Sequence, residues 1–371
     1  MRASVASMRE GDAVAEARFK VVVQKPPQQQ LPGGSSFNLA VADYSFEEEA
    51  LAPIGAAIVE LEAGSDADYI EQAKDADAVI ARGRMITAEI IAGLGNCKVI
   101  GCGSVGTDRV DVDAATRHGI PVTNVPDVFI EEVADHTMAL LLAAHRHLYE
   151  MRALIRAGRW VEGHPYMRNF PRLYGQTLGL IAFGNVGRAV ARRAQAFGLH
   201  VIAHDPYVAE TEMTSEGVEP VGLMELLGRS DFVSNHGPLN EETHHLMSTA
   251  QFAAMKPNAI FVNAGRGPSH DEAALIDALQ RGAIAGAALD VFEVEPADPE
   301  NPLFQMDNVI VTPHIASATS RMMPETRRRL GQEIALVLQG RWPRSAVNPQ
   351  ALQNSNLVRW QPQPMSRGPN R

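Results

Sequence analysis

The sequence has few cysteines, no excess of positive charge and no long apolar run. Cys97 and Cys102 are its two cysteines, too few for a disulfide framework, so we expect a reducing compartment, the cytoplasm. The formal net charge of −11 argues against a surface that binds nucleic acid or an anionic membrane. No apolar stretch approaches the ~18 residues that a membrane-spanning helix needs. We therefore predict neither a nucleic-acid nor a membrane partner.

The length and composition allow more than one folded domain. The chain has 371 residues, a length typical of about two domains. Its hydrophobic fraction of 45% is enough for packed cores. Residues 1–36 are polar and carry no apolar signal-peptide core, so they are predicted to be a disordered leader. Residues 349–371 have no apolar period and are predicted to be a disordered tail. The folded part is therefore expected between residues 37 and 348.

Short apolar segments alternate with helical patterns along this folded part. In its first run we expect alternating strands and helices at Asn38–Ala42, Phe46–Leu51, Ala57–Leu61, Asp68–Lys74, Ala78–Ala81, Ala88–Leu94, Val99–Cys102, Val112–His118 and Val122–Asn124. In its second run, from residue 177, further strands are expected at Val201–His204, Phe232–Asn235, Ala259–Asn263, Ala285–Asp290 and Val309–Thr312. Such alternation predicts the α/β class, with two Rossmann-like or flavodoxin-like parallel-sheet domains.

Two helical patterns lie outside this alternation. Glu131–Ile155 is apolar nearly all round, and such a helix is buried in a core or in a subunit interface. We expect one continuous helix there that contributes to a homodimer. The later pattern Glu325–Leu338 is expected to return and pack on the first unit.

The segment Thr177–Asp205 has the order that dinucleotide binding requires: strand, tight turn, helix, strand and acidic residue. Gly184 lets the backbone approach a pyrophosphate, and Gly187 lets the new helix pack closely on the strand. The N–H groups of Asn185 and Val186 then point at the phosphates from the helix N-terminus. The segment therefore predicts a dinucleotide site.

Two single residues refine that prediction. Asp205 stands where a carboxylate meets the ribose hydroxyls of adenosine, and it would repel a 2′-phosphate, so NAD is the predicted cofactor in preference to NADP. Ala182 stands where the usual fingerprint has its first glycine. An alanine is expected to fit there if the backbone φ is negative.

Three polar residues follow the last three expected strands in turn. They are Arg266, Glu295 and His314. Because ligands sit outside the carboxyl ends of parallel strands, we expect these side chains on one rim. A guanidinium can hold a substrate carboxylate, an imidazole can exchange the proton of a C–OH/C=O couple, and a carboxylate can orient that imidazole. The rim therefore predicts a hydride-transfer site.

The motifs around these residues resemble those of the D-isomer-specific 2-hydroxyacid dehydrogenases, over about residues 37–348. The matching segments are Val125–Asp127, Glu132–His136, Asn263–Gly267, Leu289–Phe292, Glu295–Pro296 and Thr312–His314. The resemblance implies that Arg266, Glu295 and His314 are the catalytic residues. It also implies a homodimer and a substrate domain, residues 37–126 and 315–348, around an inserted NAD-binding domain, residues 127–314.

The resemblance further implies the residues that bind substrate and cofactor. The substrate carboxylate is expected on backbone N–H groups of the loop at Ser104, Val105 and Gly106, together with Arg266. Many relatives have glycine at the position of Ser104, whose hydroxyl adds a contact or narrows the pocket. Besides the fingerprint residues, cofactor contacts are expected at His236, Pro238, Thr243, Asn263, Ala264 and Asp290.

Five further polar residues are open to two interpretations. His236 either touches cofactor or substrate or only shapes the wall of the site. Arg82 and Arg84 either face the cleft or lie on a solvated loop. His244 and His245 are expected on a solvated helix face, because no Cys, Asp or third His accompanies them at metal-ligand spacing, and no metal site is predicted.

The predicted reaction moves a hydride between nicotinamide and C2 of a D-2-hydroxy acid or 2-keto acid that the sequence does not identify. One alternative is a phosphoglycerate dehydrogenase, which the segments Ile100–Cys102 and Val105–Asp108 also resemble. Another is an NAD(H)-sensing corepressor similar to the C-terminal binding proteins, but their aromatic residue after the catalytic His is missing at Ala316 and Ser317. Formate dehydrogenases are disfavoured, since they carry Gln where Glu295 stands.

Overall fold

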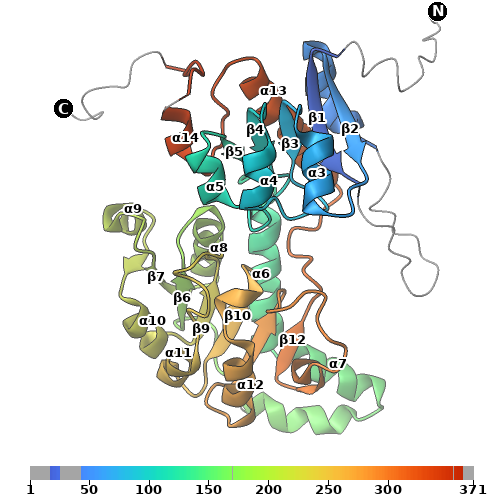
Figure 1. The fold of residues 1–371 in the computed structure, drawn as a ribbon. Coiled ribbons are helices and arrows are strands. Elements are labelled where there is room, and N and C mark those ends of the chain that lie inside the picture. The colour runs from blue at the N-terminus through green and yellow to red at the C-terminus, as the bar shows by residue number, and fades with distance from the viewer. Residues whose placement is uncertain (1–16, 26–42, 169, 354, 362–371) are drawn as a thin grey trace, which may run out of the picture. The chain divides into compact units, whose positions relative to one another are not determined.

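The structure is a computed structural model that describes residues 17–25, 43–168, 170–353 and 355–361. The chain divides into two compact units, Met1–Val128 with Ser320–Arg371, and Phe129–Thr319. The sequence placed these divisions at 126/127 and 314/315, a few residues earlier in each case. Each unit is an α/β domain with its own parallel sheet (Figure 1).

The first unit has a five-stranded parallel sheet in the order β2-β1-β3-β4-β5. Its strands are β1 (Phe19–Gln24), β2 (Ala56–Leu61), β3 (Ala78–Ile80), β4 (Val99–Gly101) and β5 (Val122–Thr123). Its helices are α2 (Ser45–Leu51), α3 (Asp66–Ala73), α4 (Ala88–Gly93), α5 (Val112–Arg117), α13 (Met322–Leu338) and α14 (Pro349–Gln353), with a short 3₁₀ turn η1 (Ala52–Ile54). Except for the expected strand Asn38–Ala42, which lies outside the described residues, the predicted alternation is present.

Two predictions at the chain ends are wrong where the structure describes them. The supposed leader contains β1, whose residues Val21–Val23 are fully buried and which pairs with both β2 and β3. The supposed tail contains α14, where Ala351 and Leu352 are buried. Both segments are short and separated from other apolar patterns by polar sequence, so periodicity along the chain did not reveal that distant residues cover them.

The expected return of the C-terminal helix to the first unit is confirmed. Leu330 and Ile334 of α13 belong to the apolar cluster on one face of the five-stranded sheet. The contact is close, because a Cβ on Gly101 of β4 would lie 2.6 Å from Leu330 Cδ1. On its other side, α13 lies against α2, where a Cβ on Gly331 would lie 2.5 Å from the carbonyl oxygen of Glu47. Small residues at these points allow the helix to pack on both elements.

The second unit has a seven-stranded parallel sheet in the order β12-β11-β10-β9-β6-β7-β8. Its strands are β6 (Thr177–Ile181), β7 (His200–His204), β8 (Glu219–Pro220), β9 (Phe232–Asn235), β10 (Ile260–Asn263), β11 (Gly286–Leu289) and β12 (Val309–Val311). Its helices are α6 (Ile130–His145), α7 (Leu148–Arg156), α8 (Asn185–Ala196), α9 (Glu210–Ser215), α10 (Leu223–Arg229), α11 (Thr249–Ala254) and α12 (Glu272–Gln280), with 3₁₀ segments η2 (Trp160–Arg168), η3 (Gly267–Ser269) and η4 (Pro302–Gln305). The strand order reverses beside β6, which is where open α/β sheets bind ligands.

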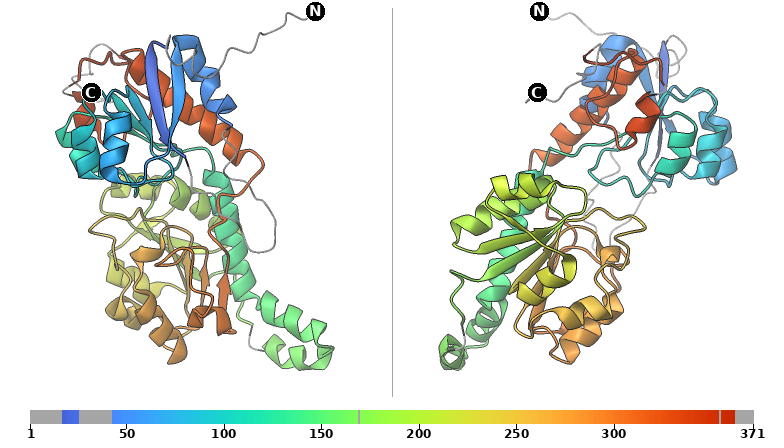
Figure 2. Two further views of the ribbon diagram at one scale, coloured as in Figure 1. Left: turned by 45° about the vertical axis from the view of Figure 1, so that its right-hand side comes forward. Right: turned by 90° about the vertical axis from the view of Figure 1, so that its left-hand side faces the viewer.

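Helices cover both faces of this sheet (Figure 2). One apolar cluster joins the strands to α6 and α8, and a second joins them to α10, α11 and α12. Strands buried on both faces explain the near-continuous apolar runs that the sequence shows at β6, β10 and β11.

The single helix predicted over Glu131–Ile155 is wrong. The structure has two helices, α6 and α7, that meet at His147, whose backbone φ of +50° lies in the left-handed region. A seven-residue apolar step continues across such a break, so the sequence pattern did not reveal it. The two helices also differ in burial: α6 carries buried side chains along its length, whereas none of the α7 residues is buried.

Candidate active site

The turn between β6 and α8 is open on the side that faces away from the protein. A Cβ on Gly184 would meet no atom within 4 Å, and Gly184 is the N-cap of α8 without a side-chain cap. The first N–H groups of α8, those of Asn185 and Val186, are thus available to an anion. Gly187 is required for another reason, since a Cβ there would lie 2.5 Å from the carbonyl oxygen of Ala182. This cradle fits the pyrophosphate of a dinucleotide.

The prediction of a negative φ at Ala182 is wrong. Its φ is +72°, in the left-handed region that glycine tolerates and alanine disfavours. The turn therefore keeps the geometry of the glycine that the fingerprint usually has, at a conformational cost of about 1–2 kcal/mol. The sequence could not show this, because the geometry is imposed by the strand and helix on either side.

Asp205, directly after β7, is joined to the same turn. Its Oδ2 accepts the N–H of Phe183 at 2.9 Å, and its Oδ1 accepts the N–H of Tyr207 at 2.9 Å. A carboxylate has about four acceptor positions, so both oxygens can accept further donors such as ribose hydroxyls. The predicted ribose contact therefore fits the geometry.

The three residues predicted on one rim follow three neighbouring strands that are in register. Asn263 of β10 pairs with Leu289 of β11, which pairs with Val311 of β12, so these strands end at the same edge. The loops beyond them carry Arg266, Glu295 and His314. The structure therefore brings the predicted set to one rim of the second unit.

Glu295 and His314 are in direct contact. His314 Nδ1 lies 2.6 Å from Glu295 Oε2, and the other carboxylate oxygen accepts the N–H of Phe292 at 3.1 Å. The second imidazole nitrogen, Nε2, is therefore the one left for a substrate. Both side chains are partly exposed, at 47% for His314 and 35% for Glu295.

The contact changes the pKa of both groups. The hydrogen bond that His314 donates to Glu295 raises the pKa of His314, and together with the charge of Glu295 it outweighs the opposing effects of burial and of the Arg266 charge. Burial alone would raise the pKa of Glu295, but the hydrogen bonds from His314 and the Phe292 N–H, with the nearby positive charges, lower it overall. The pair therefore favours an imidazolium beside a carboxylate, and the charge of Arg266 acts on both groups.

Asp290, predicted as a cofactor contact, braces the loop that carries His314. It is fully buried, its Oδ1 accepts the Ile315 N–H at 2.9 Å, and its Oδ2 accepts the Ala316 N–H at 2.8 Å. Its carbonyl oxygen accepts the N–H of His314 at 2.8 Å. These bonds hold His314 at a φ of +52°, a strained backbone of the kind found at functional sites. Thr312 Oγ1 adds a bond to Asp290 Oδ1, 2.6 Å.

Asn263, another predicted cofactor contact, braces the loop of Arg266. It is fully buried; its side-chain oxygen accepts the Gly265 N–H at 3.0 Å and its amide donates to the carbonyl of Arg266 at 3.0 Å. Two residues of this network were not predicted from the sequence: Asn235 and Ser269, where the Asn235 amide donates to Ser269 Oγ at 2.6 Å. Both are polar residues at or beyond strand ends, which is the signal that could have identified them.

The remaining predicted cofactor contacts border the same rim. Ser234 Oγ lies 2.9 Å from His236 Nε2, and burial lowers the pKa of His236 to about 4, so its imidazole is neutral at pH 7. Thr243 Oγ1 donates to the carbonyl of Pro238 at 2.6 Å and closes the loop between them. Ala264 lies in the turn braced by Asn263. Whether these residues contact the cofactor stays a prediction.

In the first unit, the predicted substrate loop follows β4. Ser104 Oγ donates to the carbonyl of Gly106 at 2.6 Å, so its hydroxyl stabilises the loop itself. The carbonyl of Val105 accepts the amide of Asn124 at 2.7 Å. This loop lies at the carboxyl end of its strand, where the prediction requires it.

Arg82 and Arg84, for which the sequence allowed two interpretations, both make hydrogen bonds within the first unit. Arg82 Nη2 donates to Glu47 Oε1 at 2.9 Å. Arg84 pairs with Asp66 and also donates to the carbonyl of Ala63 at 2.8 Å. These contacts favour a structural role in the loops after β3.

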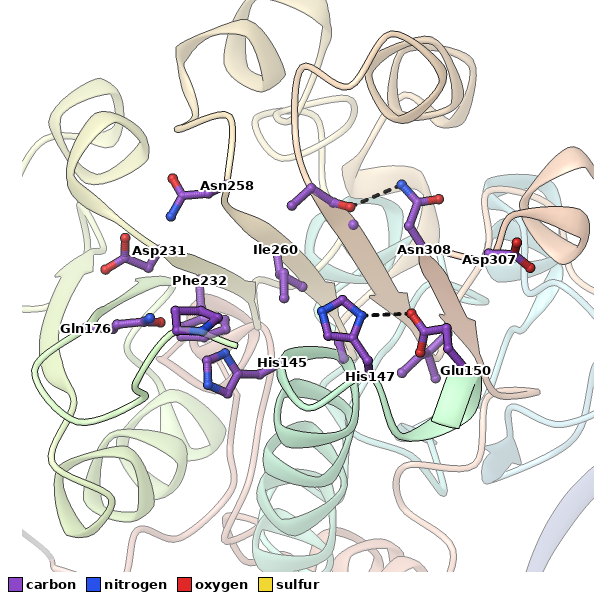
Figure 3. A pocket seen from close by; sticks show the side chains of 15 residues that line it. His145, His147, Glu150, Gln176, Asp231, Phe232, Asn258, Ile260, Asp307 and Asn308 are labelled. Carbon is purple, nitrogen blue, oxygen red and sulfur yellow. Dashed lines mark hydrogen bonds and ion pairs between the residues drawn. The ribbon is translucent and has the colours of Figure 1, made fainter. Parts of the chain in front are cut away.

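A cavity of about 230 Å³ lies at the opposite edge of the second sheet (Figure 3). His145, His147 and Glu150 line it from the α6–α7 junction, with His147 Nδ1 2.9 Å from Glu150 Oε1. Its other walls come from residues that precede or begin strands, among them Gln176, Asp231, Asn258, Asp307 and Asn308. Because open parallel sheets bind ligands at the carboxyl ends of their strands, this cavity is not the candidate active site.

The described ranges contain neither a membrane-spanning helix nor a cluster of metal-binding side chains. None of the helices in those ranges is both long and apolar enough to cross a membrane. No group of three or more His, Cys, Asp or Glu side chains within them is arranged to hold a metal ion.

Comparison with known proteins agrees with this geometry. Residues 138–316 match the model of the "D-isomer specific 2-hydroxyacid dehydrogenase, NAD binding domain". The chain is 44% identical over 268 residues to a glyoxylate reductase of Korarchaeum cryptofilum, covering 72% of this chain and 80% of that protein. It is 40% identical over 299 residues to a D-3-phosphoglycerate dehydrogenase of Methanocaldococcus jannaschii, covering 80% of this chain but 56% of that relative.

A similar solved structure contains NAD. The chain superposes on the D-lactate dehydrogenase of Aquifex aeolicus complexed with NAD and lactic acid, with a TM-score of 0.71 and 27% identity. The match covers 90% of this chain and 97% of that one. The fold and the rim of the second unit thus define an NAD-dependent 2-hydroxyacid dehydrogenase.

The chain belongs to the D-isomer-specific 2-hydroxyacid dehydrogenase family. The predictions of family, of the α/β class, of NAD as cofactor and of the reaction class are therefore confirmed. The relatives named here are enzymes, which favours the dehydrogenase over the corepressor alternative.

Proposed function

We propose that this chain reduces a small 2-keto acid to the D-2-hydroxy acid, with Arg266, Glu295 and His314 as its catalytic residues. The observation that carries the proposal is the 2.6 Å contact between His314 and Glu295 beside the charge of Arg266. Bound NADH would supply the hydride. Asn185 and Val186 would hold its pyrophosphate, and Asp205 its adenosine ribose.

Each side chain has one task in this proposal. Glu295 keeps His314 protonated and fixes its ring through Nδ1, so that Nε2 donates the proton to the keto oxygen. Arg266 binds the substrate carboxylate through paired N–H groups and so orients the carbonyl. In the oxidation direction the neutral imidazole would accept the hydroxyl proton at the same nitrogen.

For the substrate we propose an acid of the size of glyoxylate, bound also by the backbone N–H groups of Ser104, Val105 and Gly106. Support comes from the glyoxylate reductase relative, which the chain matches over 80% of its length. The second candidate is 3-phosphoglycerate, from the relative that it matches over 56%. Initial rates with NADH and a panel of 2-keto acids, including glyoxylate and 3-phosphohydroxypyruvate, distinguish the two.

The catalytic assignment is tested with His314→Ala. The proton donor is lost while the dinucleotide cradle is untouched, so keto-acid reduction should fall about 10²–10⁴-fold with the Kd for NADH within about twofold of the parent. Stopped-flow reduction and NADH fluorescence titration measure the two quantities. Undiminished turnover in this variant would reject His314 as the proton donor.

We further propose a homodimer and a cytoplasmic location. The dimer is supported by α7 and η2, which expose Leu148, Tyr149, Ile155, Trp160 and Val161 to more than half of their surface. Monomeric proteins rarely expose apolar side chains in such a group. The location is supported by Cys97 and Cys102, which are free thiols.

A further inference from the structure

The loops that carry Arg266 and Glu295 are in backbone contact outside the proposed catalytic set. A Cβ on Gly267 would lie 1.7 Å from the carbonyl oxygen of Phe292 and 2.7 Å from the nitrogen of Glu293. The chain after β10 therefore rests directly on the chain after β11. Contacts that hold Glu293 in place therefore also hold the distance between the Arg266 loop and the Glu295 loop.

Glu293 is held by two other elements. Its Oε1 lies 2.7 Å from His245 Nε2, and its Oε2 accepts the N–H of Glu272 at 3.1 Å, at the first residue of α12. The N–H of Glu293 donates back to Glu272 Oε2 at 3.1 Å. The hydrogen bonds from Glu272 and His245 lower the pKa of Glu293 although burial, the largest single influence, raises it.

The expectation of a solvated helix face at His245 is wrong, because His245 lies in a third loop, the one that follows β9. Its backbone φ is +52°, and its N–H donates to the carbonyl of Pro268 at 2.9 Å. Two residues on, the N–H of Met247 donates to the carbonyl of Ser269 at 3.1 Å. The His245 loop is therefore bound to the segment that follows Arg266 through its backbone, and to the Glu295 loop through its ring.

We infer that the His245–Glu293 pair is a positioning device that keeps the Glu295 loop seated against the Arg266 loop. The inference rests on the function proposed above and adds two residues outside its catalytic set. Both side chains are about one-third exposed, at 34% and 32%, so the pair adds little to global stability. Its effect is on geometry, where a displacement of about 1 Å costs on the order of 10²-fold in rate.

The test uses variants that break the pair without disturbing the backbone. His245→Asn keeps a residue type that tolerates the left-handed region but is too short to reach Glu293. Glu293→Ala removes the acceptor of both donors, the His245 ring and the Glu272 N–H. His245→Gln places an amide N–H where Nε2 stands and serves as the rescue variant. The matched control is Glu241→Ala, at an exposed carboxylate of the loop that carries His245.

We expect His245→Asn and Glu293→Ala each to lower kcat for keto-acid reduction about tenfold and to raise the KM for the keto acid. The Kd for NADH and the Tm should stay near the parent values. The double variant should be no worse than the more damaging single one, because both remove one interaction. His245→Gln should recover most of kcat, and Glu241→Ala should match the parent.

Two results overturn the inference. One is a kcat within twofold of the parent in both single variants. The other is a parallel loss of NADH binding and Tm, which would show general damage to the unit. His314→Ala, measured alongside, separates a failure of the positioning role from a failure of the proposed function. If His314→Ala abolishes turnover and the pair variants leave it unchanged, only the positioning role is rejected. If His314→Ala is fully active, the proposed catalytic function is rejected.

Discussion

At the scale of single residues, strained backbone marks the functional turns of the second unit. Ala182 and His314 both have positive φ, at +72° and +52°. Ala182 lies in the dinucleotide turn, and His314 is held by bonds to Asp290. For residues with a side chain, this conformation persists only where the surroundings impose it. The two positions differ in what a substitution should do, because one side chain has a proposed chemical task and the other has none.

Ala182→Gly should stabilise the protein. Relief of the left-handed strain is worth about 1–2 kcal/mol, and the greater freedom of glycine in the unfolded chain offsets about 0.4–1 kcal/mol, which leaves a net gain of about 0.5–1 kcal/mol in the free energy of unfolding. Urea denaturation measures it. The control is Ala253→Gly on the exposed face of α11, which should destabilise. Equal effects at both positions would contradict the strain at Ala182.

Glu295→Gln should move the pH dependence of keto-acid reduction. Reduction needs protonated His314, whose pKa is raised by Glu295, so the rate falls as pH rises through that raised value. Removal of the carboxylate charge lowers the pKa of His314, and the falling limb should shift to lower pH. The measurement is a kcat/KM profile for parent and variant. An unmoved limb would reject the electrostatic role of Glu295 even if the variant is slow.

At the scale of elements, the site depends on strands that end in register and on the turns after them. β10, β11 and β12 pair so that three loops leave one edge of the sheet. On the other side of β6, the unit β6-α8-β7 supplies the dinucleotide turn, and Asp205 fastens the end of β7 to it through the Phe183 N–H. The proposal gives the same carboxylate a second task, the preference for NAD over NADP.

Asp205→Ala should relax the preference for NADH over NADPH. The carboxylate repels a 2′-phosphate, so its removal should lower the ratio of kcat/KM with the two cofactors by about tenfold, roughly 1.4 kcal/mol. Glu210→Ala, an exposed acidic residue at the start of α9, is the control and should leave the ratio unchanged. A parent enzyme with equal efficiency for both cofactors would contradict the prediction at the outset.

At the scale of the whole molecule, two α/β units are built from one chain that leaves the first unit and returns to it. The return is made by α13, which packs on the five-stranded sheet through Leu330 and Ile334. Within the described part of the second unit, α7 has no buried residue, and Trp160 and Val161 of η2 are exposed beside it in the sequence. We therefore expect these exposed apolar side chains to lie in the interface of a homodimer.

Light scattering at micromolar concentration should give a mass of twice the 40.1 kDa of one chain. Leu148→Glu combined with Ile155→Glu should shift the mass toward the monomer, since a charged group cannot be buried in an apolar interface without a large cost. Met224→Glu changes an equally exposed apolar side chain on α10 and should leave the mass unchanged. A monomeric parent would refute the homodimer.

Features that depend on local order along the chain could be predicted from the sequence. The turn at Gly184, Gly187 and Asp205 and the rim residues Arg266 and His314 follow from apolar strands, their lengths and the residues that end them. Such patterns are visible because a parallel strand and the loop after it are contiguous in sequence, and the family motifs lie in these same loops.

Features that depend on contacts between distant segments are set only by the tertiary structure. It placed β1 between β2 and β3, divided the predicted long helix at His147, and gave Ala182 a positive φ. It also joined His245 to Glu293 across loops that are remote in the sequence. In each case the cause is packing or hydrogen bonding between segments whose separation in the sequence carries no information about their distance in space.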